Sequence, residues 1–119
     1  MGHLFVKRIY EPADKADGIR ILIDRLWPRG VKKERAQIDK WMKGVAPSTA
    51  LRKEFHSNPQ DWPKFQQDYI AELKVQESVR ELVELIKESE AVTLLYAANN
   101  EQQNHARVLK QFLQGELKQ

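Results

Sequence analysis

The segment 24–30, with the sequence DRLWPRG, places two arginines around a rigid Trp-Pro pair. The guanidinium groups of Arg25 and Arg29 are always charged, and each matches carboxylate or phosphate oxygens in a bidentate fork. The ring of Trp27 could stack on a base or a sugar. In the structural alternative, Asp24 pairs with an arginine and Trp27 anchors the core. The sequence leaves both interpretations open.

A second polar group lies at residues 46–52, with the sequence APSTALR, and marks the start of a helix. The N-terminus of a helix attracts anions through its free backbone N–H groups and its positive dipole end. Ser48 and Thr49 add hydroxyl groups, and Arg52 lies one turn further on. We therefore expect these residues to bind an anion. The alternative makes Ser48 a helix cap and Arg52 a surface charge.

A third group, containing Tyr96, Asn104 and His105, follows an apolar stretch near the C-terminus. We expect Tyr96 and Asn104 to orient a ligand and His105 to act as general acid or base near neutral pH. A lone helical histidine is more often a packing or hydrogen-bonding residue, so that alternative stays open. His105 and Arg25 are the catalytic candidates. The ligand-binding candidates are Arg29, Ser48, Thr49, Arg52, Trp27, Tyr96 and Asn104.

Strands and helices must position these groups. Apolar stretches predict strands at residues 4–10, 19–24 and 91–98, with a loop at 26–31. The last strand is almost wholly apolar, which is typical of a buried parallel strand. Apolar periodicity predicts four helical regions. They are residues 33–43, a short helix capped by Ser48, a long helix that starts at Asn58-Pro59 and breaks near 74–77, and a last helix capped by Asn99-Asn100.

Alternating strands and helices predict a small α/β fold. We expect a mainly parallel sheet with helices packed on both faces, a three-layer α/β/α arrangement, in one domain of residues 1–119. In such sheets ligands bind beyond the carboxyl ends of the strands. Residues 24–29 and 97–105 both follow predicted strands. Because Arg25, Arg52 and His105 all lie at strand ends or in early helix turns, we expect them to converge on one concave surface.

Composition excludes several kinds of site. The 119 residues contain no cysteine, which excludes disulfides, thiolate catalysis and cysteine-ligated metals. We expect no metal and no cofactor, because metal-ligand spacings, a Walker-type loop, a dinucleotide glycine fingerprint and a nucleophile elbow are all missing. The sequence has no apolar run long enough to cross a membrane and no secretory signal, so we expect a cytoplasmic protein without membrane contact.

Five strings stand in order along the chain: VKRIYE at 6–11, IDRLWPRGV at 23–31, APSTALR at 46–52, LLYAA at 94–98 and NHA at 104–106. Together they resemble the YeaO-like bacterial proteins, a domain-of-unknown-function family. The resemblance covers nearly the whole chain, and DRLWPRG is its most specific string. It implies a small cytoplasmic α/β protein and supports one shared site for the three polar groups. The resemblance does not imply an activity.

Two functions follow from these observations. The leading hypothesis is a site for a small phosphate- or carboxylate-bearing ligand, with hydrolase or transferase chemistry left open. The alternative is a non-catalytic module that binds nucleic acid or a protein partner through the basic segment 25–35, with Trp27 exposed. The net charge of +3 is too mild to decide between them. We expect no sequence-specific DNA binding, since no helix concentrates Arg, Asn and Gln on an exposed face. The sequence does not indicate the oligomeric state.

Overall fold

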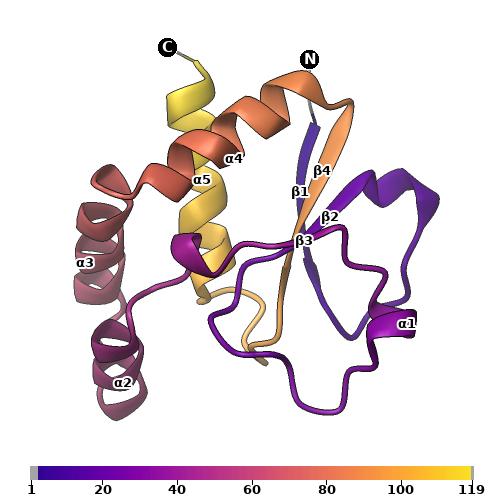
Figure 1. The fold of residues 1–119 in the computed structure, drawn as a ribbon. Coiled ribbons are helices and arrows are strands. Elements are labelled where there is room, and N and C mark those ends of the chain that lie inside the picture. Colours follow the sequence, from indigo (N-terminus) through magenta and orange to yellow (C-terminus); the bar gives the residue numbers. More distant parts are fainter. Residues whose placement is uncertain (1–2, 119) are drawn as a thin grey trace.

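The structure is a computed structural model and describes residues 3–118 (Figure 1). Its strands are β1 (His3–Arg8), β2 (Ile19–Leu22), β3 (Lys40–Trp41) and β4 (Ala91–Tyr96). Its helices are α1 (Lys33–Ala36), α2 (Thr49–Ser57), α3 (Trp62–Lys74), α4 (Glu77–Glu88) and α5 (His105–Leu117), with short 3-10 turns η1 (Lys15–Asp17) and η2 (Lys43–Val45). No helix within 3–118 has the length and apolar character needed to span a membrane.

The strands form one parallel sheet in the order β1-β4-β2-β3. The strand β4 lies inside the sheet and pairs with both β1 and β2, which explains why it is mostly apolar; the hydroxyl of its buried Thr93 donates to the Asp17 carbonyl at 2.7 Å. This confirms the expected parallel α/β fold. Because the strands run the same way, their carboxyl ends meet at one edge of the sheet, where ligands bind in folds of this type.

Helices α4 and α5 cover the first face of the sheet, and α3 packs against the outer side of α5 (Figure 1). Ile21 from β2 and Leu94 from β4 are fully buried beneath them, as are Leu82 of α4 and Leu109 of α5. Complete burial of one such side chain contributes about 1.5–3 kcal/mol. This face therefore supplies most of the hydrophobic stabilisation. Helix α2 packs beside α3, at the end of the molecule away from the sheet (Figure 1).

The second face is covered by the short helix α1 and by loops. Leu22 and Leu95 are fully buried there, against Ala36 of α1. Trp27 and Trp41 pack on this smaller cluster edge to face, with ring centroids 5.4 Å apart. Helices thus lie on both faces, as expected, but one of the two layers is mostly loop.

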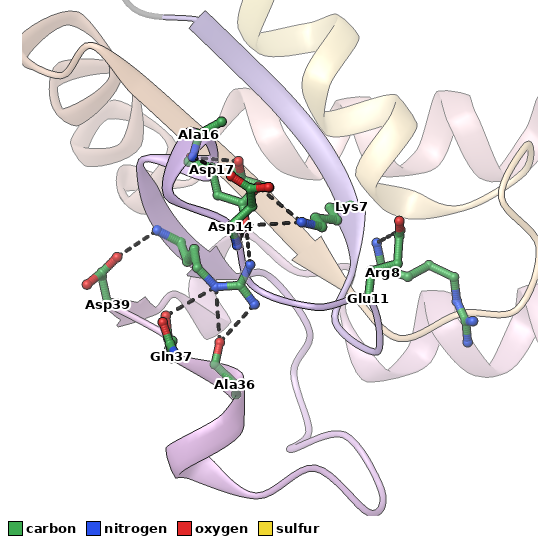
Figure 2. Close-up of polar contacts among 11 residues, drawn as sticks. Lys7, Arg8, Glu11, Asp14, Ala16, Asp17, Ala36, Gln37 and Asp39 are labelled. Atoms are coloured by element: carbon green, nitrogen blue, oxygen red, sulfur yellow. Dashed lines mark hydrogen bonds and ion pairs between the residues drawn. The ribbon is translucent and has the colours of Figure 1, made fainter.

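A polar network occupies the rest of the second face (Figure 2). Arg20 is only 4% exposed; it donates to the Ala36 carbonyl at 2.8 Å and to Asp17 at 2.5 Å. Lys7 also binds Asp17, at 3.2 Å, and Figure 2 shows both side chains meeting beside Asp14. Burial raises the pKa of Asp17, but hydrogen bonds from the Asp14 backbone, Lys7 and Arg20 outweigh it and hold the pKa below its ordinary value. The network ties η1 and α1 to the sheet.

The predicted helix at 33–43 is wrong. Helix α1 ends at Ala36, because Gln37 adopts a left-handed conformation with φ of 47°. The chain then forms β3, which pairs with β2, and the Trp41 indole donates to the Asp24 carbonyl at 2.7 Å. The apolar spacing of residues 38–45 matches helical periodicity although the segment is not a helix. In the structure it reflects a strand followed by the turn η2.

Two predicted helix starts are also wrong, while two other boundaries are confirmed. Helix α3 begins at Trp62, after Asp61 rather than at Asn58. Helix α5 is capped by Asn104, because Asn100 instead accepts from two backbone N–H groups in the preceding loop. The Ser48 cap is confirmed by its bond from the Leu51 N–H, and the break at 74–77 falls between α3 and α4.

Candidate anion-binding site

A cavity of about 250 Å³ opens at the carboxyl ends of β2 and β4. Four parts of the chain line it: the segment after β2, the entry and inner side of α2, Phe65 of α3, and the segment that leads from β4 into α5. Arg25, Arg52 and His105 all lie in this lining. Their expected convergence on one concave surface is confirmed.

The imidazole of His105 is held against the end of β2. Its Nε2 lies 3.2 Å from the Ile23 carbonyl and 3.0 Å from Oδ1 of Asp24. Both neighbours are acceptors, so Nε2 carries a proton. The alignment favours the carbonyl, which leaves Asp24 Oδ1 without a hydrogen bond of good geometry. The other oxygen of Asp24 accepts the Ala97 N–H at 3.1 Å. His105 is therefore fixed in place, and its Nε2 is not a free base.

Arg25 bridges the cavity wall. Its Nε donates to the Pro47 carbonyl at 3.1 Å and its Nη2 to the Ala46 carbonyl at 3.2 Å. These bonds join the segment after β2 to the segment that enters α2. Within residues 3–118, Arg25 has no ion pair with a carboxylate. Its positive charge is thus uncompensated, although part of its hydrogen-bonding capacity is used.

Arg52, on α2, is the least engaged arginine of the cavity. The described part of the chain gives its side chain neither a hydrogen bond nor an ion pair, and its Nε is buried without a partner. A buried N–H without an acceptor costs about 1–3 kcal/mol. A ligand oxygen that reached this guanidinium would recover that cost and balance its charge.

Aromatic and apolar side chains form the rest of the wall. Phe55 of α2 stacks on Phe65 of α3 with centroids 4.5 Å apart, and Trp62 stacks on Phe65 at 5.5 Å. Tyr69 lies edge-on to His105, with its hydroxyl donating to the Val45 carbonyl. Burial raises the pKa of Tyr69 well above its ordinary value, so the phenol stays neutral. This cluster holds α2 against α3 and gives the cavity an apolar side.

Asn104 lines the cavity, but most of its side-chain hydrogen-bonding groups already bind backbone groups. Its side-chain oxygen caps α5 by accepting the Arg107 N–H at 3.1 Å, and its amide donates to the Asn100 carbonyl at 2.9 Å. One amide N–H remains for another acceptor. Asn104 orients His105 at the first position of α5 and can contribute one further donor.

Five sequence-based candidates do not line the cavity. Trp27 packs on Trp41 and donates its indole N–H to the Val31 carbonyl at 2.8 Å. Arg29 and Thr49 are exposed elsewhere. Tyr96 is buried in the main core, and burial raises its pKa. Ser48 is the fifth. The basic segment 25–35 therefore has no free aromatic platform at Trp27.

The hydroxyl of Ser48 is occupied by a carboxylate. It donates to one oxygen of Glu72 at 2.6 Å, while the Ser48 backbone N–H donates to the other at 2.8 Å. Glu72 lies on α3, 24 residues away, so no local pattern indicated this pair. The bonds lock the start of α2 onto α3. They also place a negative charge at this helix N-terminus, where an anion was expected.

Sequence reasoning missed part of the lining. Sequence patterns assign no role in the site to Leu26, Pro47, Phe55 or Phe65, and they present Asp24 only as a partner for arginine. The position of Asp24 directly before Arg25, at the end of a strand, was the one available signal. The apolar residues gave none, because their spacing is that of ordinary core positions. Within residues 3–118 no cluster of three or more metal-ligating side chains occurs.

Comparison with known proteins agrees with the motifs. A family model described as the inactive DUF488-N3 subclade, DUF488-N3i, matches residues 3–119. The chain belongs to this family. It is 48% identical over 107 residues to the uncharacterized protein YeaO of Escherichia coli (strain K12), covering 90% of this chain and 93% of YeaO. It is 39% identical over 110 residues to the uncharacterized protein Rv3073c of Mycobacterium tuberculosis (strain ATCC 25618 / H37Rv), covering 92% of each.

The uncharacterized protein Mb3100c of Mycobacterium bovis (strain ATCC BAA-935 / AF2122/97) matches to the same extent, with 39% identity over 110 residues. The predicted resemblance to YeaO-like proteins is therefore confirmed. No solved structure matches this chain.

Proposed function

We propose that this protein is a cytoplasmic binder of a small organic anion, held in the cavity by Arg52 and Arg25. The observation that carries this proposal is a pair of guanidinium groups in one cavity without a carboxylate partner in the described residues. Asp24, the one acid among the described residues of the lining, accepts the Ala97 N–H and lies 3.0 Å from Nε2 of His105. Lining charges that the protein itself leaves unbalanced favour a ligand of opposite charge.

Binding without catalysis fits the surroundings of His105. Its Nε2 faces a backbone carbonyl and Asp24. The hydroxyls of Ser48 and Tyr69 are already bonded, to Glu72 and to the Val45 carbonyl. A nucleophile and a free base within reach of each other are what acyl or phosphoryl transfer requires. The description of the matched family as inactive also supports a binding role. We propose a structural role for His105, which holds Asp24 and the rim of the cavity in position.

A thermal-shift panel tests this function. The wild-type protein is melted with benzoate, phenylacetate, citrate, phenyl phosphate and inorganic phosphate, each against sodium chloride of equal ionic strength. A ligand at 100 times its Kd stabilises the folded state by about 2.7 kcal/mol, so a binder raises the melting temperature. We expect at least one of these anions to give a saturable increase that sodium chloride does not reproduce.

Arg52→Gln and Lys53→Gln provide the matched comparison. Both remove one positive charge from α2, but Lys53 is exposed and does not line the cavity. Losing a charge-assisted hydrogen bond costs about 1.5–3 kcal/mol, so Arg52→Gln should weaken binding roughly 10- to 100-fold. Lys53→Gln should keep the wild-type affinity. The proposed function would be contradicted if an anion raised the melting temperature of both variants equally. It would also be contradicted if no anion of the panel raised the melting temperature of the wild type.

A further inference from the structure

The charges of the residues that line the cavity favour a ligand with a single negative charge. Arg25 and Arg52 contribute two positive charges and Asp24 one negative charge, which leaves one positive unit when His56 and His105 are uncharged. A monoanion balances this unit. A dianion would bring a second negative charge next to Asp24, and unpaired like charges at close range are unfavourable.

The walls favour an apolar ligand body. Six of the lining residues are apolar, namely Leu26, Ala46, Pro47, Phe55, Phe65 and Ala98. Each square ångström of apolar surface removed from water contributes about 25 cal/mol. Contact with these walls therefore makes the binding free energy of an apolar group more favourable and contributes nothing to the binding of a bare inorganic ion. The charged groups and the apolar wall belong to the same cavity. The ligand should therefore combine a charged end with an apolar end.

The size of the cavity limits that apolar end. An apolar cavity of about 150 Å³ accommodates benzene, whereas drug-sized ligands occupy about 300–1,000 Å³. The cavity here measures about 250 Å³. It can hold one ring together with a carboxylate, and it is too small to enclose a nucleotide.

We infer, on the basis of the proposed function, that the ligand is a compact monocarboxylate with an apolar group the size of a single ring, and that the site discriminates against dianionic phosphates. The carboxylate pairs with the guanidinium of Arg52. The ring packs against Phe55, Phe65 and Leu26. Asp24 is a specificity residue, because its charge disfavours a second negative charge on the ligand.

Leu26 gives experimental access to this selectivity. It lines the cavity yet is 61% exposed, so its substitution leaves the core unchanged. Leu26→Lys raises the charge of the lining from one to two positive units, which suits a dianion. Leu26→Gln is the matched control, since it removes the same apolar contact and leaves the charge unaltered.

The experiment is a calorimetric titration at pH 8 with phenylacetate, phenyl phosphate and acetate. For the wild type we expect phenylacetate to bind at least about tenfold more tightly than either of the other two, a difference of about 1.4 kcal/mol. Leu26→Lys should shift the affinity ratio about tenfold towards phenyl phosphate. Leu26→Gln should weaken both ring-bearing anions by a similar factor and keep their ratio.

In one contrary outcome, the wild type binds phenyl phosphate more tightly than phenylacetate while Arg52→Gln still weakens the binding of both anions. That result would overturn this inference and leave the proposed function standing. Saturable binding of acetate as tight as that of phenylacetate would overturn it as well. Absence of Arg52-dependent binding for every probe would remove the proposed function itself. The wild-type comparison decides the inference even if Leu26→Lys fails to fold.

Discussion

The guanidinium groups of three arginines lie in three different environments, which differ in how much hydrogen-bonding capacity each group has left. Arg20 is buried and paired with Asp17. Arg25 is half-buried and donates to two backbone carbonyls. Arg52 has neither kind of partner within residues 3–118. All three follow or precede apolar residues in a similar way, so sequence alone could not rank them.

Asp17 is the residue on which the polar network of the second face depends, and its replacement should be costly. Asp17→Asn leaves the ammonium of Lys7 and the guanidinium of Arg20 without their acidic partner. Breaking a buried pair in this way destabilises a protein by about 3–5 kcal/mol. We expect a lower urea midpoint at pH 7, measured by circular dichroism.

The same residue predicts a dependence on acid. Folding lowers the pKa of Asp17 below 3.8, so its contribution is fully present above that pH and is lost as the pH falls through the lower folded value. The difference in the free energy of unfolding between the wild type and Asp17→Asn should become smaller as the pH falls below about 4. Glu81→Gln, at an exposed position of α4, serves as control and should follow the wild type at each pH. A difference that stays constant down to pH 2 would contradict this account.

Which single residues could be predicted depends on how local their partners are. The cap role of Ser48 is local, because its acceptor bond comes from Leu51 three residues on, and the sequence predicts it correctly. The bond from Ser48 to Glu72 joins two helices and leaves no trace in either local pattern. Trp27 follows the same rule: its packing partner Trp41 is brought next to it by pairing of β3 with β2.

At the scale of elements, boundaries set by long-range contacts were the ones that sequence patterns missed. The buried strand β4 was evident because nearly every residue in it is apolar. Strand β3 has two residues, and its pairing with β2 stabilises it rather than any propensity of its own. The start of α5 was placed five residues early, since Asn100 and Asn104 are both good caps by type and only the fold selects between them.

Glycine substitutions test how closely the elements are packed. Gly18 lies directly before β2 with φ of 66°, and a Cβ there would collide with the Ala91 carbonyl of β4. Gly30 has φ of 77° with open space around it, and Gly115 lies in α5, also in open space. We expect Gly18→Ala to be strongly destabilising, Gly30→Ala to cost about 1 kcal/mol, and Gly115→Ala to stabilise by about 0.5–1 kcal/mol.

Thermal unfolding of the three variants checks this order. A Gly18→Ala protein that melts within a degree or two of the Gly30→Ala protein would show that β2 and β4 can separate locally. The contact at the start of β2 would then not constrain the sheet.

For the whole molecule, the parallel sheet explains why residues far apart in the sequence share one cavity. Strands β2 and β4 end at the same edge, so the segments after them, 24–26 and 98–105, meet there. This general rule allowed the location of the cavity to be predicted. It could not supply the contribution of α2, whose position depends on the Ser48–Glu72 bonds and the Phe55–Phe65 stack.

The most direct test of the central claim follows the Arg52 side chain itself. In a nuclear magnetic resonance titration with phenylacetate, the Nε–H resonance of Arg52, assigned by its absence in Arg52→Gln, should move in a saturable manner. Its movement should give the same Kd as the backbone amides that line the cavity, because a carboxylate that pairs with the guanidinium changes the environment of this buried N–H. An Arg52 resonance that stays still while backbone amides elsewhere saturate would contradict the account, since the anion would then bind at another site.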